Sequence, residues 1–175
     1  MSEKLITEIE LIQKYARAKD DENWRFRSFV KGHLNMGDAA LDTVVRDTAD
    51  EVMEQIDCTT CGHCCRALQI VVDDFDLSRL AKALGQPAAA LKKQYTKRAD
   101  DGALVFSSQP CPFLEGNICS VYEHRPRACR DFPFLHEKGF RQRMFMFLDN
   151  TFVCPIVFNT CELLKRRLPF RRSRR

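Results

Sequence analysis

The feature that most constrains this chain is a dense run of cysteines, Cys58-Thr59-Thr60-Cys61-Gly62-His63-Cys64-Cys65. A Cys-x-x-Cys segment lets two thiolates converge on one metal ion while backbone N–H groups turn toward the sulfurs. Gly62 suits the positive φ that such a turn needs. The run therefore predicts a metal site that ties together the middle of the chain.

Four further cysteines lie in well-separated segments downstream, and two of them are directly followed by proline. The eight thiols of the predicted site are Cys58, Cys61, Cys64, Cys65, Cys111, Cys119, Cys129 and Cys154. Eight thiols suit two four-coordinate sites, or one polynuclear site with cysteines to spare. The ninth cysteine, Cys161, falls on a predicted helix and is expected to be a buried thiol outside the metal site.

The spacing leaves the metal open between iron and zinc. Zinc ribbons present two separate Cys-x-x-Cys pairs, whereas the later cysteines are spaced Cys111-x7-Cys119-x9-Cys129. Three thiols in a Cys-x-x-Cys-x-x-Cys run are similar to the arrangement by which bacterial ferredoxins hold iron–sulfur clusters. Adjacent Cys64 and Cys65 cannot easily aim at one ion. They are expected to serve different metals, to bridge two, or to divide into a ligand and a reactive thiol.

Four arginines lie in the same segments as the cysteines. Arg66 directly follows Cys65. The three others that lie close to Cys129 are Arg125, Arg127 and Arg130. Four thiolates around zinc, or around an oxidised four-iron cluster, leave a negative charge that nearby cations offset in a partly dry site. Ordinary surface charge is the alternative interpretation of these side chains.

Apolar residues at helical spacing predict three helices in the cysteine-free N-terminal third. The first runs from Leu5 to about Ala18, and the second follows Asp20-Asp21-Glu22, which suits the positive end of a helix dipole. The third is capped by Asp38 and continues to Ile56. These helices are expected to form a core.

From Cys58 onward the predicted elements are shorter. A helix capped by Asp74 or Asp76 should end at Gly85, and the turn Glu115-Gly116-Asn117 should bring the segments of Cys111 and Cys119 together. The remaining predictions are strands at 68–72, 104–106 and 143–148, a helix at 88–98, and a last helix that starts at Pro155.

Together these elements predict an α+β fold that is mostly helical with short strands. A helical N-terminal segment, 1–57, is expected to pack on a small cysteine-rich, metal-stapled module, 58–164, which a basic C-terminal tail, 165–175, follows. The tail carries seven Lys and Arg residues and no acid, so the other residues sum to a charge of −3. Such a block predicts a mobile arm that is separable from the fold and makes weak contact with nucleic acid; a solubilising tail is the alternative.

The chain also lacks several signals. No apolar stretch follows Met1-Ser2-Glu3-Lys4, and no run is long and apolar enough to span a membrane, so a cytoplasmic chain with reduced cysteines is expected. With seven glycines there is no G-x-G-x-x-G and no phosphate-binding loop, and there is no G-x-S-x-G or H-E-x-x-H. Any catalysis would therefore have to be carried out by the bound metal.

Four ordered blocks carry a resemblance to a known family. They are Cys58-x-x-Cys61-Gly62-x-Cys64-Cys65-Arg66, Cys111-Pro112-Phe113-Leu114, the segment from Cys119 to Pro133, and Cys154-Pro155. They resemble the YkgJ-type cysteine-cluster family (CxxCxxCC), a zinc- or iron-chelating domain that was earlier labelled an iron–sulfur oxidoreductase. The resemblance spans about residues 58–157 and implies metal chelation through the eight matching cysteines.

Two functions follow as hypotheses. The first is a metal-binding protein that holds an iron–sulfur cluster or iron, for electron transfer with a redox protein partner or for iron handling. If such a metal-binding protein is an enzyme, the class expected is an iron–sulfur oxidoreductase. The second is a structural zinc module that mediates protein or nucleic-acid interaction.

Overall fold

The computed structural model describes residues 5–171, which form two compact units. The helical unit comprises the described residues up to Asp57 and those from Pro133 onward, and the cysteine unit runs from Cys58 to Phe132. The sequence favours a cysteine module that extends to residue 164. In the structure, the segment after Phe132 belongs instead to the helical unit. The fold is α+β and mostly helical, as predicted.

Side chains of the helical unit explain why the chain after Pro133 packs there. The carboxylate of Asp42 accepts hydrogen bonds from the backbone N–H groups of Gly139 and Phe140, each at 2.9 Å. The guanidinium of Arg141 donates to the carbonyl oxygens of Val30 and Met36. These bonds satisfy backbone groups that no helix or strand pairs, so they hold the connecting segment on the helices.

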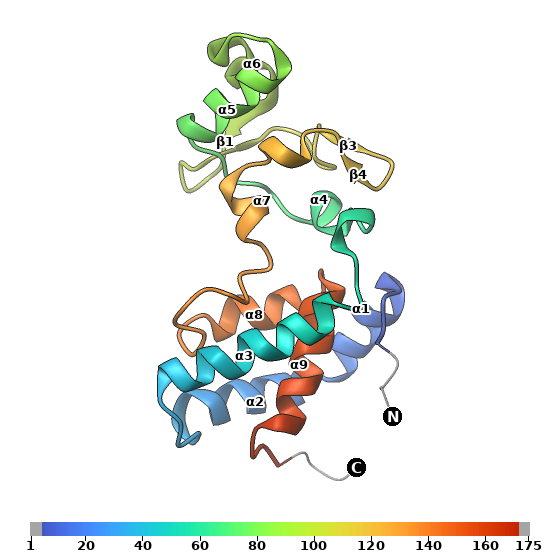
Figure 1. Cartoon of the computed structure of the whole chain (residues 1–175), viewed down its shortest axis with the longest axis vertical. Coiled ribbons are helices and arrows are strands. Elements are labelled where there is room, and N and C mark those ends of the chain that lie inside the picture. The colour runs from blue at the N-terminus through green and yellow to red at the C-terminus, as the bar shows by residue number, and fades with distance from the viewer. Residues whose placement is uncertain (1–4, 172–175) are drawn as a thin grey trace. The chain divides into compact units, whose positions relative to one another are not determined.

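Five helices build the helical unit (Figure 1). They are α1 (Ile9–Ala18), α2 (Asp20–Gly32), α3 (Asp38–Met53), α8 (Met144–Asn150) and α9 (Pro155–Arg167). The last of them, α9, packs against α1, α3 and α8. The predicted strand at 143–148 is wrong because Met144, Phe147 and Leu148 are buried at the i, i+3, i+4 spacing of a helix.

The starts of two helices differ from the prediction. The first helix begins at Ile9 rather than Leu5, because the side chain of Asn159 on α9 accepts from the Ile6 N–H at 3.0 Å and donates to the Ile6 carbonyl at 2.7 Å. The Ile6 carbonyl would otherwise accept an intrahelical hydrogen bond in a helix that starts at Leu5, whereas its N–H would need a partner outside such a helix in any case. Gly37 rather than Asp38 is the N-cap of α3, and the Asp38 carboxylate accepts a hydrogen bond from Arg141 instead.

The cysteine unit consists of short elements. They are the 3₁₀ turn η1 (Cys58–Thr60), α4 (His63–Ala67), α5 (Asp74–Leu84), α6 (Ala88–Tyr95), β1 (Thr96–Arg98), β2 (Leu104–Phe106), β3 (Leu114–Glu115), β4 (Ile118–Cys119), the 3₁₀ turn η2 (Tyr122–His124) and α7 (Arg127–Asp131). Strands β1 and β2 form one antiparallel pair, and β3 and β4 form the other. The core of this unit includes Leu80, Leu91, Phe106 and Phe113.

Several predicted boundaries in the cysteine unit shift. Asp73, one residue earlier than predicted, caps α5 in a reciprocal arrangement with Asp76, and Gly85 ends that helix with φ of 64° as expected. The predicted strand at 68–72 is reduced to a single bridge between Val71 and Val105. The helix predicted at 88–98 stops at Tyr95 because the next three residues pair with β2.

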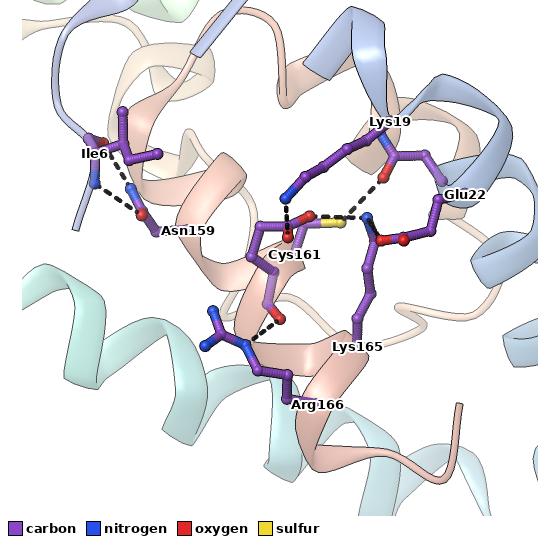
Figure 2. A network of polar contacts seen from close by, with 9 residues as sticks. Ile6, Lys19, Glu22, Asn159, Cys161, Lys165 and Arg166 are labelled. Carbon is purple, nitrogen blue, oxygen red and sulfur yellow. Dashed lines mark hydrogen bonds and ion pairs between the residues drawn. The ribbon is translucent and has the colours of Figure 1, made fainter. Parts of the chain in front are cut away.

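The basic tail is not a mobile arm over its described part. Helix α9 continues to Arg167, and the fully buried Lys165 ammonium lies 2.9 Å from a carboxylate oxygen of Glu22 and 2.8 Å from one of Glu162 (Figure 2). Leu168 is buried, and the Phe170 ring lies 5.2 Å from that of Phe26. The prediction of a mobile arm is therefore wrong for 165–170, because side chains of α2, α3 and α9 hold this segment. Residues 172–175 lie outside the described residues.

Within residues 5–171, we find no helix that combines the length and the apolar character needed to cross a bilayer.

Candidate metal centre

All nine cysteines lie among the described residues, and none of them forms a disulfide. The cysteine unit contains seven of them, Cys58, Cys61, Cys64, Cys65, Cys111, Cys119 and Cys129. The other two, Cys154 and Cys161, belong to the helical unit. The eight predicted ligands are thus divided seven to one between the units.

The cysteine loop, residues 58–65, begins with η1 and turns at Gly62 into α4. The Cys61 N–H donates to the carbonyl of Cys58 at 3.3 Å, and Gly62 has φ of 62°. A Cβ at Gly62 would lie 2.8 Å from the backbone oxygen of Asn117, in the turn between β3 and β4. The expected positive φ is confirmed, and the close approach adds a second reason for glycine at this position.

Two sets of hydrogen bonds join the cysteine loop to the segment 111–119. The backbone N–H of Cys111 donates to the carbonyl of Cys65 at 2.8 Å. On the other side, the Arg66 guanidinium donates to the Gly62 carbonyl at 3.1 Å, to the side-chain oxygen of Asn117 at 2.8 Å, and to the Gly116 carbonyl. These contacts bring cysteines that are far apart in the sequence into one region.

The remaining cysteines of this region lie on two short elements. Cys119 lies on β4, opposite Leu114 of β3, and Cys129 lies on α7. Together with Cys111 they pack against the buried core of the cysteine unit, of which Phe113 is a member. The predicted turn at Glu115-Gly116-Asn117 is confirmed, and it places the segments of Cys111 and Cys119 close together as expected.

Four thiols interact electrostatically. Burial raises the pKa of Cys111 to about 11, and charge on Cys65 and Cys119 raises it as well. Burial raises the pKa of Cys129 to about 12, with further contributions from charge on the other three thiols. Burial also raises the pKa of Cys119, and charge on Cys65 acts in the same direction. The three thiols that face Cys65 are therefore protonated at neutral pH.

Cys65 differs from these three thiols. A hydrogen bond from the Cys64 side chain is the main cause that lowers the pKa of Cys65 to about 7, against a raising effect of burial, and the Arg66 charge lowers it further. Near neutral pH, Cys65 is accordingly divided between thiol and thiolate. The adjacent pair is thus asymmetric, since one thiol donates and the other accepts.

Two of the four predicted arginines act on thiols. Arg66 lowers the pKa of Cys65, and Arg125 favours the charged forms of Cys119 and Cys129 while it stacks on the Tyr122 ring at 3.7 Å. The other two bond elsewhere. Arg127 pairs with Asp131 at 3.1 Å, and Arg130 donates to the carbonyl of Arg125 at 2.9 Å.

The donor chemistry of this region fits zinc or iron, since thiolates are preferred ligands of both and two guanidinium groups offset their charge. The geometry is looser than that of a closed site. Among residues 5–171, no three His, Cys, Asp or Glu side chains converge closely enough to hold a metal ion. Coordination would require the thiols to lose their protons and to draw together.

The two cysteines of the helical unit are buried. Cys154 is the N-cap residue of α9 and 6% exposed. Cys161 lies on the same helix, 1% exposed, with its Sγ 4.0 Å from the side-chain oxygen of Asn23, and burial raises its pKa to about 12 (Figure 2). The expectation of a buried thiol at Cys161 is confirmed.

Sequence reasoning missed the role of the β3–β4 turn. Gly116 and Asn117 were expected to shape a hairpin, whereas in the structure they also accept hydrogen bonds from Arg66. The available signal was the position of a Gly-Asn turn two residues before Cys119, which places polar acceptors beside a cysteine segment.

One comparison with known proteins gives a match. The family model CxxCxxCC, described as "Putative zinc- or iron-chelating domain", matches residues 57–155, a span that includes all eight predicted ligands. Neither a comparison with curated proteins nor one with solved structures gives a match.

Proposed function

Because the chain belongs to the CxxCxxCC family of zinc- or iron-chelating domains, we propose that its cysteine unit binds zinc or iron through cysteine thiolates. One observation carries the proposal: four thiols from separate positions of the chain lie near one another, so that charge on Cys65 raises the pKa of Cys111, Cys119 and Cys129. As thiolates these groups would repel one another, so without metal the three thiols other than Cys65 stay protonated. A metal cation that replaces their protons offsets that repulsion and is bound strongly.

These four thiols are the proposed primary ligands. Cys58, Cys61 and Cys64 of the cysteine loop extend the donor set toward a second metal or a polynuclear cluster. Cys154, the eighth ligand that the sequence predicts, belongs to the helical unit and stays a prediction. Because Cys111 and Cys129 have pKa values of about 11 and about 12, metal binding must release protons. Apparent metal affinity should therefore rise with pH around neutrality.

Iron is the metal we propose, held as an iron–sulfur cluster for electron transfer or as iron in an iron-handling role. The number of thiols supports this choice, since the seven within one unit exceed the four of a single zinc site. A redox protein would then be the partner, and an oxidoreductase activity would be the cluster's own chemistry.

Zinc is the second candidate, favoured by the four thiols that interact most directly, because four thiolates suit tetrahedral zinc. In that case the module is structural and mediates contact with a protein or nucleic acid. The tail supports nucleic-acid contact less than its composition suggests, since Lys165 is buried and Arg167 pairs with Glu51.

Purification without oxygen, followed by elemental analysis and a visible absorption spectrum, tests these proposals. An iron–sulfur protein is brown and contains iron and acid-labile sulfide, whereas a zinc protein is colourless. A chain that contains zinc and no iron would replace the first candidate by the second. A chain that retains neither metal, and takes up neither when it is supplied to the reduced protein, would contradict metal chelation itself.

A further inference from the structure

Arg66 is the side chain that connects the cysteine loop to the β3–β4 hairpin. One terminal nitrogen of its guanidinium donates to Gly62 within the loop, and the other donates to Gly116 and Asn117 in the hairpin turn. The two segments are separated by 51 residues along the chain at the Arg66 and Asn117 contact. No helix or strand ladder makes this connection among the described residues.

A second contact joins the cysteine loop to the segment that precedes the hairpin. The Cys111 N–H donates to the Cys65 carbonyl at 2.8 Å. The segment 111–117 is thus attached at the Cys65 carbonyl and at the Arg66 guanidinium, which also holds the carbonyl of Gly62, two residues before Cys64. At Gly62 the Asn117 backbone leaves no room for a side chain, since a Cβ there would lie 2.8 Å from the Asn117 backbone oxygen.

Resting on the proposed function, we propose that Arg66 is a positioning residue for the metal site: its guanidinium fixes the thiols of Cys64 and Cys65 in register with those of Cys111 and Cys119. Its role is therefore more than the neutralisation of thiolate charge. The planar guanidinium can serve acceptors on two segments at once, whereas a lysine ammonium is a compact point charge without that fixed geometry.

The expected size of the effect follows from other metal sites. Partners that orient the ligands of a metal, without contacting it, change metal affinity by about 10–100-fold when they are removed. Loss of the guanidinium would leave Cys64 and Cys65 attached to the segment 111–119 at the Cys65 carbonyl and free to shift at the Gly62 end. The metal would then have to restrict that motion as it binds.

The test uses the full-length reduced protein and Co²⁺ as the probe, because the absorption of thiolate-bound cobalt reports how many thiolates bind and in what geometry. Arg66→Lys keeps the charge and loses the planar fork. Arg98→Lys is the matched control, since Arg98 of the same unit is also exposed and donates to the carbonyl of a glycine four residues away, Gly102, at 2.7 Å.

We expect Arg66→Lys to weaken Co²⁺ binding about tenfold or more and to alter its absorption spectrum, while Arg98→Lys leaves both unchanged. Asn117→Ala removes one acceptor and should shift affinity and spectrum in the same direction by a smaller amount. If Arg66→Lys does not fold, Asn117→Ala decides the question by the same two measurements.

Three results would overturn the inference. They are a wild-type spectrum and affinity in Arg66→Lys, no change in Asn117→Ala, or an equal loss in Arg98→Lys. A wild-type protein that does not bind Co²⁺ at all would instead contradict the proposed metal chelation, so the two failures are distinguishable.

Discussion

Gly62 of the cysteine loop combines a positive φ with a lack of space for a side chain. Gly85, at the end of α5, has nearly the same φ, 64° against 62°, but no atom lies within 4 Å of the position its Cβ would take. We expect Gly85→Ala to cost about 1 kcal/mol through backbone strain and Gly62→Ala roughly 2–3 kcal/mol, because the methyl group also displaces the Asn117 backbone. Urea denaturation of both variants measures the difference.

The Gly62 variant should also bind metal more weakly than wild type, since the displaced turn carries the acceptors of Arg66. If the two glycine substitutions lower the free energy of unfolding equally, the lack of space beside Asn117 does not contribute to the effect.

Among the cysteines, we expect the proposed metal ligands and the buried thiol of Cys161 to respond differently to substitution. Substitution by Ser should lower metal content at each proposed ligand, because serine is a poor substitute for thiolate. Cys161→Ser should leave the metal content unchanged and lower the free energy of unfolding by about 1–3 kcal/mol, since it replaces a buried thiol with a smaller and more polar hydroxyl. Elemental analysis and thermal unfolding of Cys65→Ser, Cys129→Ser and Cys161→Ser test this ranking. Loss of metal in Cys161→Ser as severe as in Cys65→Ser would contradict it.

The end of α9 is part of the helical core rather than an appended tail. Leu168 is 4% exposed, and the ring of Phe170 packs on those of Phe26 and Phe29. We expect Leu168→Ala to lower the free energy of unfolding by about 2–4 kcal/mol through a cavity, and the exposed Arg171→Ala to change it by less than about 0.5 kcal/mol. Chemical denaturation followed by circular dichroism compares the two variants. A Leu168→Ala variant as stable as Arg171→Ala would instead support the prediction that these C-terminal residues form an arm separable from the fold.

The ion pairs of Glu162 on α9 with Lys165 and with Lys19 should make the helical unit sensitive to acid. Burial would raise the pKa of Glu162, but the Lys165 charge and hydrogen bonds from Lys165 and Lys19 lower it to about 2, below the ordinary 4.5. Because the folded-state pKa is lowered, the stabilisation is complete above pH 4.5 and is lost as the pH falls toward 2.

The variant Glu162→Gln tests this pH dependence. It should be less stable than wild type by on the order of 2–3 kcal/mol at neutral pH, and the difference should shrink below pH 4.5. Glu54→Gln, at an exposed carboxylate at the end of α3, is the control and should show no such convergence. Urea midpoints measured across this pH range settle the comparison, and a constant difference between Glu162→Gln and wild type would count against the ion pairs as its cause.

At the scale of the whole molecule, metal removal should affect the two units differently. The core of the cysteine unit is small and lies among short elements, so metal binding is expected to supply much of its folding free energy. The helical unit contains long helices with their own buried residues, including Phe26, Leu41 and Leu164. Chelation under reducing conditions should therefore raise amide hydrogen exchange in 58–132 and leave α1, α2, α3 and α9 protected.

The same exchange experiment with metal restored serves as the control, and protection in the cysteine unit should return. Equal exchange in that unit with and without metal would show that the metal is not structural, and loss of protection in all helices would show that the two units fold as one.

Local patterns in the sequence determined a large part of this protein. The spacing of the cysteines identified the family, and the positive φ of Gly62 and the turn at Glu115-Gly116-Asn117 were predicted because each depends on a few adjacent residues. The helices of the N-terminal third followed from apolar periodicity for the same reason.

The tertiary structure decided what depends on partners far along the chain. Lys165 is buried because it pairs with Glu22, 143 residues away. The segment after Pro133 joins the helical unit because Asp42 binds its backbone and its Arg141 binds the Met36 carbonyl, each across about 100 residues. Arg66 positions the cysteine loop only because the fold brings Asn117 within 2.8 Å of it. Charge and periodicity describe what a side chain can bind, whereas the partner it meets, and hence whether it is buried, exposed or part of a site, depends on the packing of the whole chain.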